Sequence, residues 1–141
     1  MGSAGTLVDT GPLFAVADVT DAHHERCGDA LAAAPRPLVV PVLVVTEAAY
    51  LIGRDLGATA EVRFLAALAH GELVVEDVAP GDWLRIAELV SRYRDLPLGT
   101  VDASIVAAAE RLRITRVVTL DRRHFGIVRP RHVDLFDIVP A

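Results

Sequence analysis

The chain of 141 residues has one cysteine, no lysine and few aromatic residues. The lone Cys27 excludes an internal disulfide framework and is typical of a protein from a reducing cytoplasm. We expect Cys27 to pack as a small apolar side chain rather than to act as a nucleophile. Because aromatic residues are 5% of the sequence while hydrophobic residues are 52%, the core must be built from Ala, Val, Leu and Ile.

Long hydrophobic runs are also lacking. The longest, residues 37–45, contains two prolines and is too short to span a bilayer. No positively charged segment followed by an apolar one opens the chain, so no secretory signal is expected. These absences predict a single cytoplasmic domain over residues 1–141, without membrane association.

The net charge of −5 by itself disfavours a nucleic-acid partner, but the charge is unevenly distributed. All 14 basic residues are arginines, and residues 111–132 hold seven of them beside a single acid, Asp121. Two interpretations stay open. The stretch binds phosphate groups near Asp121, or it is an ordinary solvated surface of arginines.

Short β-branched apolar runs alternate with segments of helical periodicity. Strands are predicted at residues 5–8, 38–40, 72–76, 114–120 and 133–139, the last of them at an edge. Helices are predicted around residues 13–16, over 21–34, from 41 onwards, and over 59–70, 80–93 and 103–113, with a loop at 125–130. This order predicts an α/β fold with a central, mostly parallel sheet of about four to five short strands flanked by helices.

Two of the helices have apolar patterns that predict a buried face. The pattern over residues 59–70 places Val62 and Leu65 inward. The pattern over residues 80–93 places Trp83 and Ile86 on one face, so we expect Trp83 to be a core residue and not a base-stacking one.

Two predicted strands end in an aspartate: Asp9 follows the first, and Asp121 follows the strand at residues 114–120. Parallel strands bring their carboxyl ends to one edge of the sheet, where sites form in α/β folds. Asp102 opens a helix that is expected to pack back along the second of these strands, which would bring it near Asp121. Asp9 taken alone favours a simpler interpretation, as the cap of the helix that follows it.

Glu47 is the most informative residue of the helix that starts at Pro41. The residues three and four positions to either side of it are apolar, apart from one tyrosine hydroxyl; they are Leu43, Val44, Tyr50 and Leu51. The pattern predicts that Glu47 lies inside the apolar stripe, where a carboxylate is costly unless it is paired, hydrogen-bonded or bound to metal. The alternative is an edge position at which Glu47 reaches water.

Together, Asp9, Glu47, Asp102 and Asp121 predict a cluster of four acids. Carboxylates at close range repel one another, so the cluster needs cations to stay ionised. Oxygen ligands select hard ions such as Mg²⁺ or Mn²⁺. Such ions bind phosphates and activate water for in-line attack, which is the chemistry of metal-dependent nucleases.

Four segments of the chain resemble PIN-domain ribonucleases, and most closely the VapC-type toxins of bacterial toxin–antitoxin pairs. They are LVDTGPL at residues 7–13, Thr46-Glu47, LPLGTVDASIVA at residues 96–107, and TLDRRHF at residues 119–125. The resemblance covers nearly the whole chain and implies a three-layer PIN-like fold. It also implies cleavage of phosphodiester bonds in structured RNA, a homodimer, and inhibition by a VapB-type antitoxin.

The same resemblance implies roles for individual residues. The catalytic and metal-binding set would be Asp9, Glu47, Asp102 and Asp121, with Mg²⁺ or Mn²⁺ as the cofactor. Thr10 and Thr119 fall where small hydroxyl residues support these ligands. Arg122 and Arg123 are candidates for phosphate contacts, and we expect Asp95 to be structural.

Proteins of other classes also place acids at the carboxyl ends of parallel strands. A phosphoryl-accepting signalling domain needs a lysine beside the phosphoryl group, and this chain has none. A haloacid-dehalogenase-like phosphatase lacks its lysine here too, and has Gly11 where it needs a second aspartate. A non-catalytic protein-binding module stays open as an alternative, although the intact acid set disfavours it.

Overall fold

Five parallel strands form the centre of the molecule. The computed structural model describes residues 5–141, so residues 1–4 of the predicted domain lie outside the described part. The sheet has the order β3-β2-β1-β4-β5, and every neighbouring pair is parallel. The strands are β1 (Thr6–Val8), β2 (Leu38–Pro41), β3 (Val74–Glu76), β4 (Arg116–Val118) and β5 (Asp137–Val139). All five strands predicted from the sequence are present.

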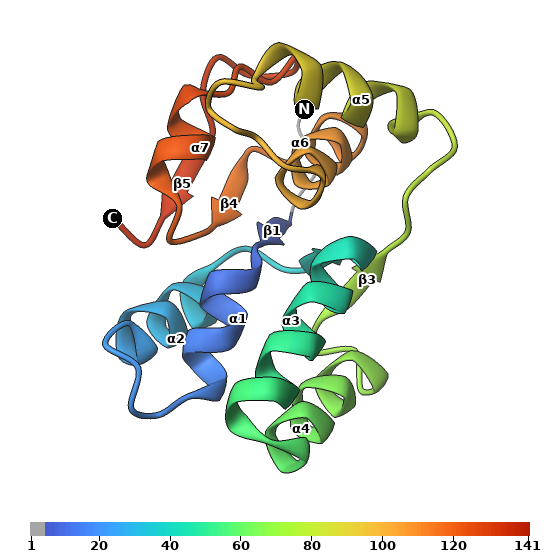
Figure 1. Ribbon diagram of the computed structural model, residues 1–141. Helices are drawn as coiled ribbons and strands as arrows, with labels where there is room; N and C mark the ends of the chain where they lie inside the picture. The colour runs from blue at the N-terminus through green and yellow to red at the C-terminus, as the bar shows by residue number, and fades with distance from the viewer. Residues whose placement is uncertain (1–4) are drawn as a thin grey trace.

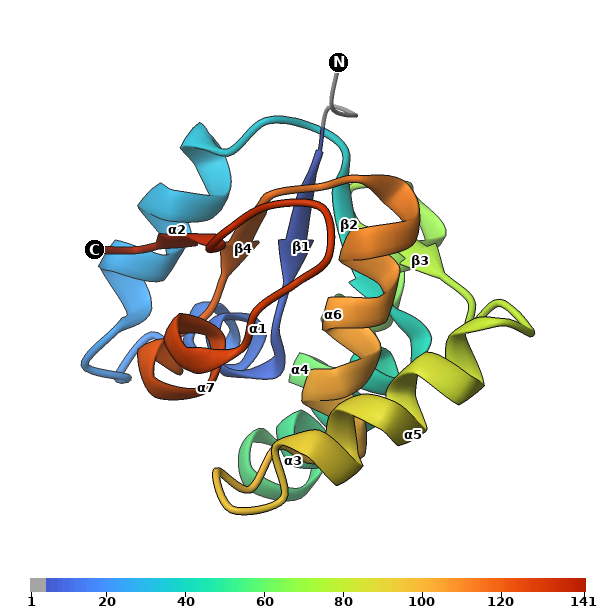
Figure 2. The same cartoon turned by 90° about the horizontal axis from the view of Figure 1, so that it is seen from above.

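Helices cover both faces of this sheet and complete a three-layer α/β fold. Four helices, α1 to α4, lie on one face, while α5, α6 and α7 lie on the other (Figures 1 and 2). They are α1 (Thr10–Ala17), α2 (His24–Ala33), α3 (Val42–Leu56), α4 (Ala58–Ala69), α5 (Asp82–Arg92), α6 (Thr100–Leu112) and α7 (Arg122–Ile127). None of the helices within residues 5–141 has the length and apolar character needed to cross a membrane. The three-layer arrangement predicted from the sequence is confirmed.

The strand order reverses at β1, and this reversal creates the site. The chain runs outward from β1 through β2 to β3, then returns to β1's other side to form β4 and β5. The helical connections on the two sides therefore cover opposite faces. Between β1 and β4 this leaves the kind of crevice at which α/β sheets bind ligands. The backbone N–H of Asp9 donates to the carbonyl of Val118 at 3.0 Å, so the carboxyl ends of β1 and β4 are held side by side.

The core consists of small aliphatic residues, as the composition predicts. Helix α6 is its centre, because every residue from 103 to 109 is buried and four of these seven are alanines. A helix that is apolar all round is expected to be enclosed, and α6 lies between the sheet and α5. The Arg85 guanidinium fixes α5 to α6 through two hydrogen bonds of 2.8 Å to the Glu110 carboxylate. This contact holds the last turn of α6, and Asp102 lies in the first turn of the same helix.

The segment after β4 differs from the sequence prediction. The strand predicted at residues 114–120 is shorter in the structure, where β4 covers Arg116–Val118. The prediction of a loop over residues 125–130 is wrong in its first half, which belongs to α7. Asp121 is the reason: its side chain accepts the backbone N–H of His124 at 2.9 Å and so caps this helix.

The predicted buried faces of α4 and α5 are wrong in part. On α4, Val62 and Leu65 are exposed and Phe64 is the residue that enters the core. On α5, Ile86 is buried as expected, but Trp83 is 52% exposed. Both helices have apolar residues on more than one face, so periodicity alone does not identify the side that meets the sheet layer.

Candidate metal centre and active site

Asp9 stands immediately after β1 and is only 8% exposed. Its Oδ1 accepts the backbone N–H of Thr10 at 2.7 Å, so Asp9 caps α1. Its Oδ2 accepts the hydroxyl of Thr119 at 2.7 Å. The capping interpretation is therefore confirmed, but it occupies one oxygen only, and the second oxygen connects Asp9 to the strand on the other side of the crevice.

Thr119 joins two of the predicted acids. While its hydroxyl donates to Asp9, the same oxygen accepts the backbone N–H of Asp121 at 2.9 Å. Thr119 is fully buried, so this bridge is shielded from water. Thr119 supports the acids as the family resemblance implies. Thr10 contributes differently, because its buried hydroxyl oxygen has no hydrogen-bond partner within residues 5–141.

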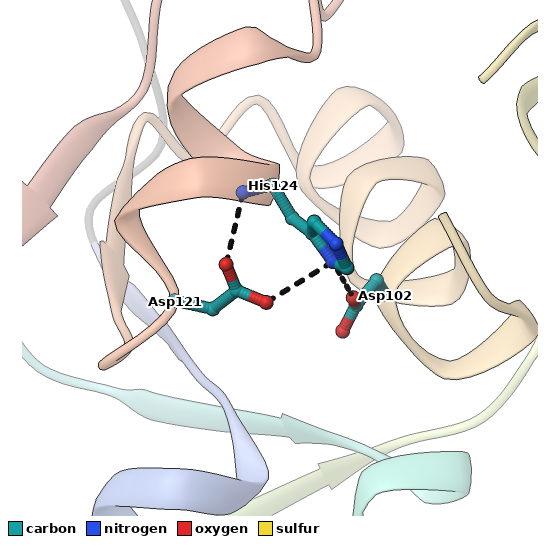
Figure 3. Close-up of side chains that lie close together, drawn as sticks. All are labelled: Asp102, Asp121 and His124. Carbon is teal, nitrogen blue, oxygen red and sulfur yellow. Dashed lines mark hydrogen bonds and ion pairs between the residues drawn. The ribbon is translucent and has the colours of Figure 1, made fainter. Parts of the chain in front are cut away.

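Asp102 and Asp121 meet at a histidine that the sequence analysis did not single out. The ring Nδ1 of His124 lies 2.8 Å from Oδ2 of Asp102 and 3.0 Å from Oδ2 of Asp121 (Figure 3). One potential ligand atom from each of the three residues lies within 4.8 Å of the other two. The spacing held a signal: a histidine three residues after a helix-capping aspartate lies on the same turn as that aspartate.

Glu47 is exposed, so the prediction that it lies inside the apolar stripe of α3 is wrong. The buried residues of α3 are Val44, Ala48 and Ile52, and Tyr50 is 64% exposed. Glu47 therefore flanks the true stripe and takes the alternative edge position that reaches water. It still faces the other acids closely enough for its charge to raise the pKa of both Asp9 and Asp102.

Burial and mutual repulsion push two of the carboxyl groups toward their neutral form. Burial is the largest cause that raises the pKa of Asp9 to about 6, and the charges of Asp102 and Glu47 add to it. The hydrogen bonds from Thr119 and Thr10 oppose this rise without cancelling it. Burial also raises the pKa of Asp102, although His124 opposes that shift.

The two arginines that follow Asp121 differ in whether their side chains already have hydrogen-bond partners. Arg122 donates to the carbonyl oxygens of Ile138 and Pro140 at 3.3 and 2.9 Å, so it is tied to the C-terminal strand. Within residues 5–141, Arg123 has neither a hydrogen bond nor an ion pair from its side chain. Arg111, Arg116 and Arg131 pair with acids. Arg123 is therefore the better of the two candidates for a phosphate contact.

Residues 6–129 match the PIN domain family. The chain belongs to this family. Ribonuclease VapC26 of Mycobacterium tuberculosis is 32% identical over 134 residues, which cover 95% of this chain and 99% of VapC26. The resemblance to VapC-type PIN-domain proteins is thus confirmed over nearly the whole chain.

Two solved structures share the fold. One is VapC20 of Mycobacterium tuberculosis, described as a sarcin-ricin loop cleaving toxin, with a TM-score of 0.78 and 24% identity over 92% of this chain and 98% of VapC20. The other is VapBC2 from Rickettsia felis bound to a DNA fragment from its promoter, with a TM-score of 0.68 and 13% identity over 96% of this chain and 99% of that chain. At these identities the likeness shows the PIN fold itself.

The residues of this PIN domain fit the divalent cation that its family resemblance implies. The donors at the β1–β4 edge are mainly carboxylate oxygens, which hard cations prefer. Without a cation, Asp9 and Asp102 have raised pKa values, and a positive charge between them would reverse that shift. The unpartnered Thr10 hydroxyl beside Asp9 is a further sign of a site that a bound group completes.

The raised pKa of Asp9 predicts a pH-dependent loss of stability in metal-free buffer. The folded state binds a proton on Asp9 more tightly than the unfolded state does. This protonation therefore stabilises the fold fully below about pH 4, and the stabilisation is lost as the pH rises through about 6. The shift corresponds to about 3 kcal/mol at most. Asp9→Asn removes the titrating group, so its unfolding free energy should increase relative to the wild type over this range.

Urea denaturation of both proteins at several pH values with a chelator measures this difference. Asp95→Asn, at an exposed acid outside the site, is the control and should follow the wild type. Parallel curves for Asp9→Asn and the wild type between pH 4 and 7 would contradict the assignment.

Proposed function

We propose that this PIN-domain protein is the toxin of a toxin–antitoxin pair and that it cleaves structured RNA as a Mg²⁺- or Mn²⁺-dependent ribonuclease. The observation that carries the proposal is the set of desolvated, mutually repelling carboxylates at the β1–β4 edge. The similarity to a protein named Ribonuclease VapC26 supports the substrate class. The shared fold with VapC20 is consistent with it.

Each acid has a distinct place in this proposal. Asp102 and Asp121 would hold the cation with one oxygen each, and Asp9 is connected to Asp121 through the Thr119 bridge. Glu47, at the exposed rim, reaches the site from α3 and would act through water. When bound, the cation would lower the pKa of a water molecule and neutralise charge on the scissile phosphate.

The other residues hold these acids in position. The N-terminus of α6 favours the ionised form of Asp102 in its first turn. The cap on α7 fixes the direction of Asp121, since one oxygen of that carboxylate is held by the His124 backbone N–H. Arg123, exposed on the same helix, would contact an RNA phosphate next to the cleaved bond.

Replacing Asp9 by asparagine separates the ligand role from the capping role. Asn caps helices about as well as Asp, so the fold should persist. The charge that would hold a cation is gone, so cleavage of RNA with Mg²⁺ or Mn²⁺ should fall by roughly a hundredfold or more, comparable to the loss of one group that stabilises charge in a transition state. Growth inhibition should be lost with it.

Asp95→Asn serves as the matched control and should cut RNA at the wild-type rate. If Asp9→Asn retained wild-type cleavage in the presence of the metal, Asp9 would be only a helix cap, and the proposed catalytic set would be wrong.

The surface offers a groove for the antitoxin on the helical face away from α5 to α7. A hollow of about 650 Å³ lies between α1, α2 and α4, with Leu13, Val16, Leu31 and Phe64 among its apolar lining residues. Arg36 and Arg63 also line it. Arg36 is occupied by backbone carbonyls, whereas the Arg63 side chain makes no ion pair within residues 5–141.

We infer that a VapB-type antitoxin lays an apolar segment with at least one acidic residue into this groove. The apolar lining would bury the hydrophobic side chains of such a segment, and Arg63 would pair with its carboxylate.

A charge placed in the groove tests this assignment. Val16 lines the groove and is 38% exposed, so Val16→Glu can be made without emptying the core. The variant should lose co-purification with the antitoxin that suppresses wild-type toxicity, because a carboxylate would have to be desolvated in the complex. Val62→Glu is the matched control: Val62 is 63% exposed and is not among the lining residues. Equal antitoxin binding by both variants would contradict the groove assignment.

The chain is also proposed to form a homodimer. Apart from the groove, Tyr50, Trp83 and Leu84 are more than half exposed, and the mean hydropathy of the chain is +0.40. Trp83 and Leu84 are neighbours on α5, and adjacent exposed apolar side chains of this size favour an interface at that helix. Light scattering at micromolar concentration should therefore give twice the mass of one chain, and a mass of one chain at that concentration would contradict the dimer.

A further inference from the structure

We propose that His124 is itself a ligand of the cation, through Nδ1, and that it makes the site favour Mn²⁺ and Co²⁺ over Mg²⁺. This inference rests on the proposed metal dependence and extends it, because the four acids alone form an all-oxygen site. The histidine is the only nitrogen donor in the three-residue group found within residues 5–141.

The distances suit three ligands of a single ion. His124 Nδ1 lies 2.8 Å from the Asp102 oxygen and 3.0 Å from the Asp121 oxygen. In octahedral coordination with metal–ligand distances of roughly 2.1 Å, adjacent ligand atoms are about 3.0 Å apart. Little movement of the three side chains is needed to place one ion among these atoms.

The backbone holds this arrangement before any ion binds. Asp121 caps α7 through the His124 backbone N–H, so one helical turn sets the direction of both side chains. Asp102 comes from the first turn of α6, on the opposite side of the group (Figure 3). The His124 and Asp102 side chains are 19% and 21% exposed, so water reaches them only partly. Ligands fixed by two rigid helices are preorganised for binding.

The same short distances also fit a His124 ring that only donates hydrogen bonds to the two carboxylates. If Nδ1 only donates a hydrogen bond, His124 competes with the cation for the carboxylate oxygens. If Nδ1 binds the cation through its lone pair, the ring proton is carried on Nε2, which has no protein partner among the described residues and can donate to water. Replacing the ring should leave cation binding unchanged or stronger in the first case and weaken it in the second.

The ligand role also predicts the selectivity. Imidazole nitrogen suits transition ions, whereas Mg²⁺ prefers carboxylate oxygen and water. Loss of the nitrogen should therefore reduce the affinity for Mn²⁺ and Co²⁺ much more than the affinity for Mg²⁺.

His124→Asn is the informative variant, because the Asn amide lies near the position of Nδ1 and can still donate to the carboxylates. His70→Asn is the control, since His70 is an exposed residue at the end of α4, outside the group. The full chain would be titrated with Mn²⁺ and with Mg²⁺ by calorimetry in slightly alkaline buffer, where free imidazole is neutral. The Mn²⁺ complexes would then be examined by electron spin echo envelope modulation.

We expect nitrogen modulation from a directly bound imidazole in the wild type and in His70→Asn, and none in His124→Asn. The Mn²⁺ affinity of His124→Asn should fall by at least about tenfold, with a smaller change for Mg²⁺. The nitrogen modulation of the wild-type complex is a test by itself, so it does not depend on whether the variant folds.

Two results would overturn the proposal while leaving the proposed function intact. One is a wild-type Mn²⁺ complex without nitrogen modulation. The other is a His124→Asn variant that binds Mn²⁺ as tightly as the wild type or more tightly, which would identify His124 as a competitor. A wild type that binds neither ion would instead overturn the proposed metal dependence together with this inference.

Discussion

The burial of Asp9 at the carboxyl end of β1, where Thr119 just after β4 donates a hydrogen bond to it, is the constraint on which the rest of this structure depends. Asp9 is 8% exposed and has a pKa raised to about 6, so the fold holds this acid where its charged form is disfavoured. Among residues 5–141, the direct compensation for this acid is the pair of hydrogen bonds from Thr10 and Thr119. Ionising Asp9 therefore weakens the fold, which is a cost that functional sites commonly carry, and a cation bound as proposed would offset it.

The strand order explains how the acids meet although they are far apart in sequence. Because the chain leaves β1 on one side and returns to β4 on the other, Asp9 and Asp121 end on neighbouring strands. The alanine-rich α6 can approach the sheet closely, and it brings Asp102 to the same edge. Glu47 comes from α3 on the opposite face, and its charge lies close enough to Asp9 and Asp102 to raise the pKa of both.

Sequence reasoning located the strands, and it placed Asp9 and Asp121 after strands and Asp102 at a helix start, as the structure has them, because strand ends and helix starts have recognisable patterns. It placed Glu47 near the site but for a wrong reason, because α3 is apolar on several faces and its buried stripe cannot be identified without the neighbouring helices. The exposure of Trp83 was missed for the same reason. The spacing of His124 from Asp121 indicated only that these two share a helical turn, whereas the contact of His124 with Asp102 on another helix has no local sequence pattern.

The charge distribution limits how RNA can be held. The chain is negative overall, and three of the seven arginines in residues 111–132 pair with acids, namely Arg111, Arg116 and Arg131. The basic charge that would attract any nucleic acid is therefore partly neutralised. If the chain binds RNA as proposed, attraction must come from a few local positive groups, chiefly the bound cation and unpaired arginines such as Arg123. Such binding depends on the shape that an RNA presents at the site, which favours structured over unstructured RNA.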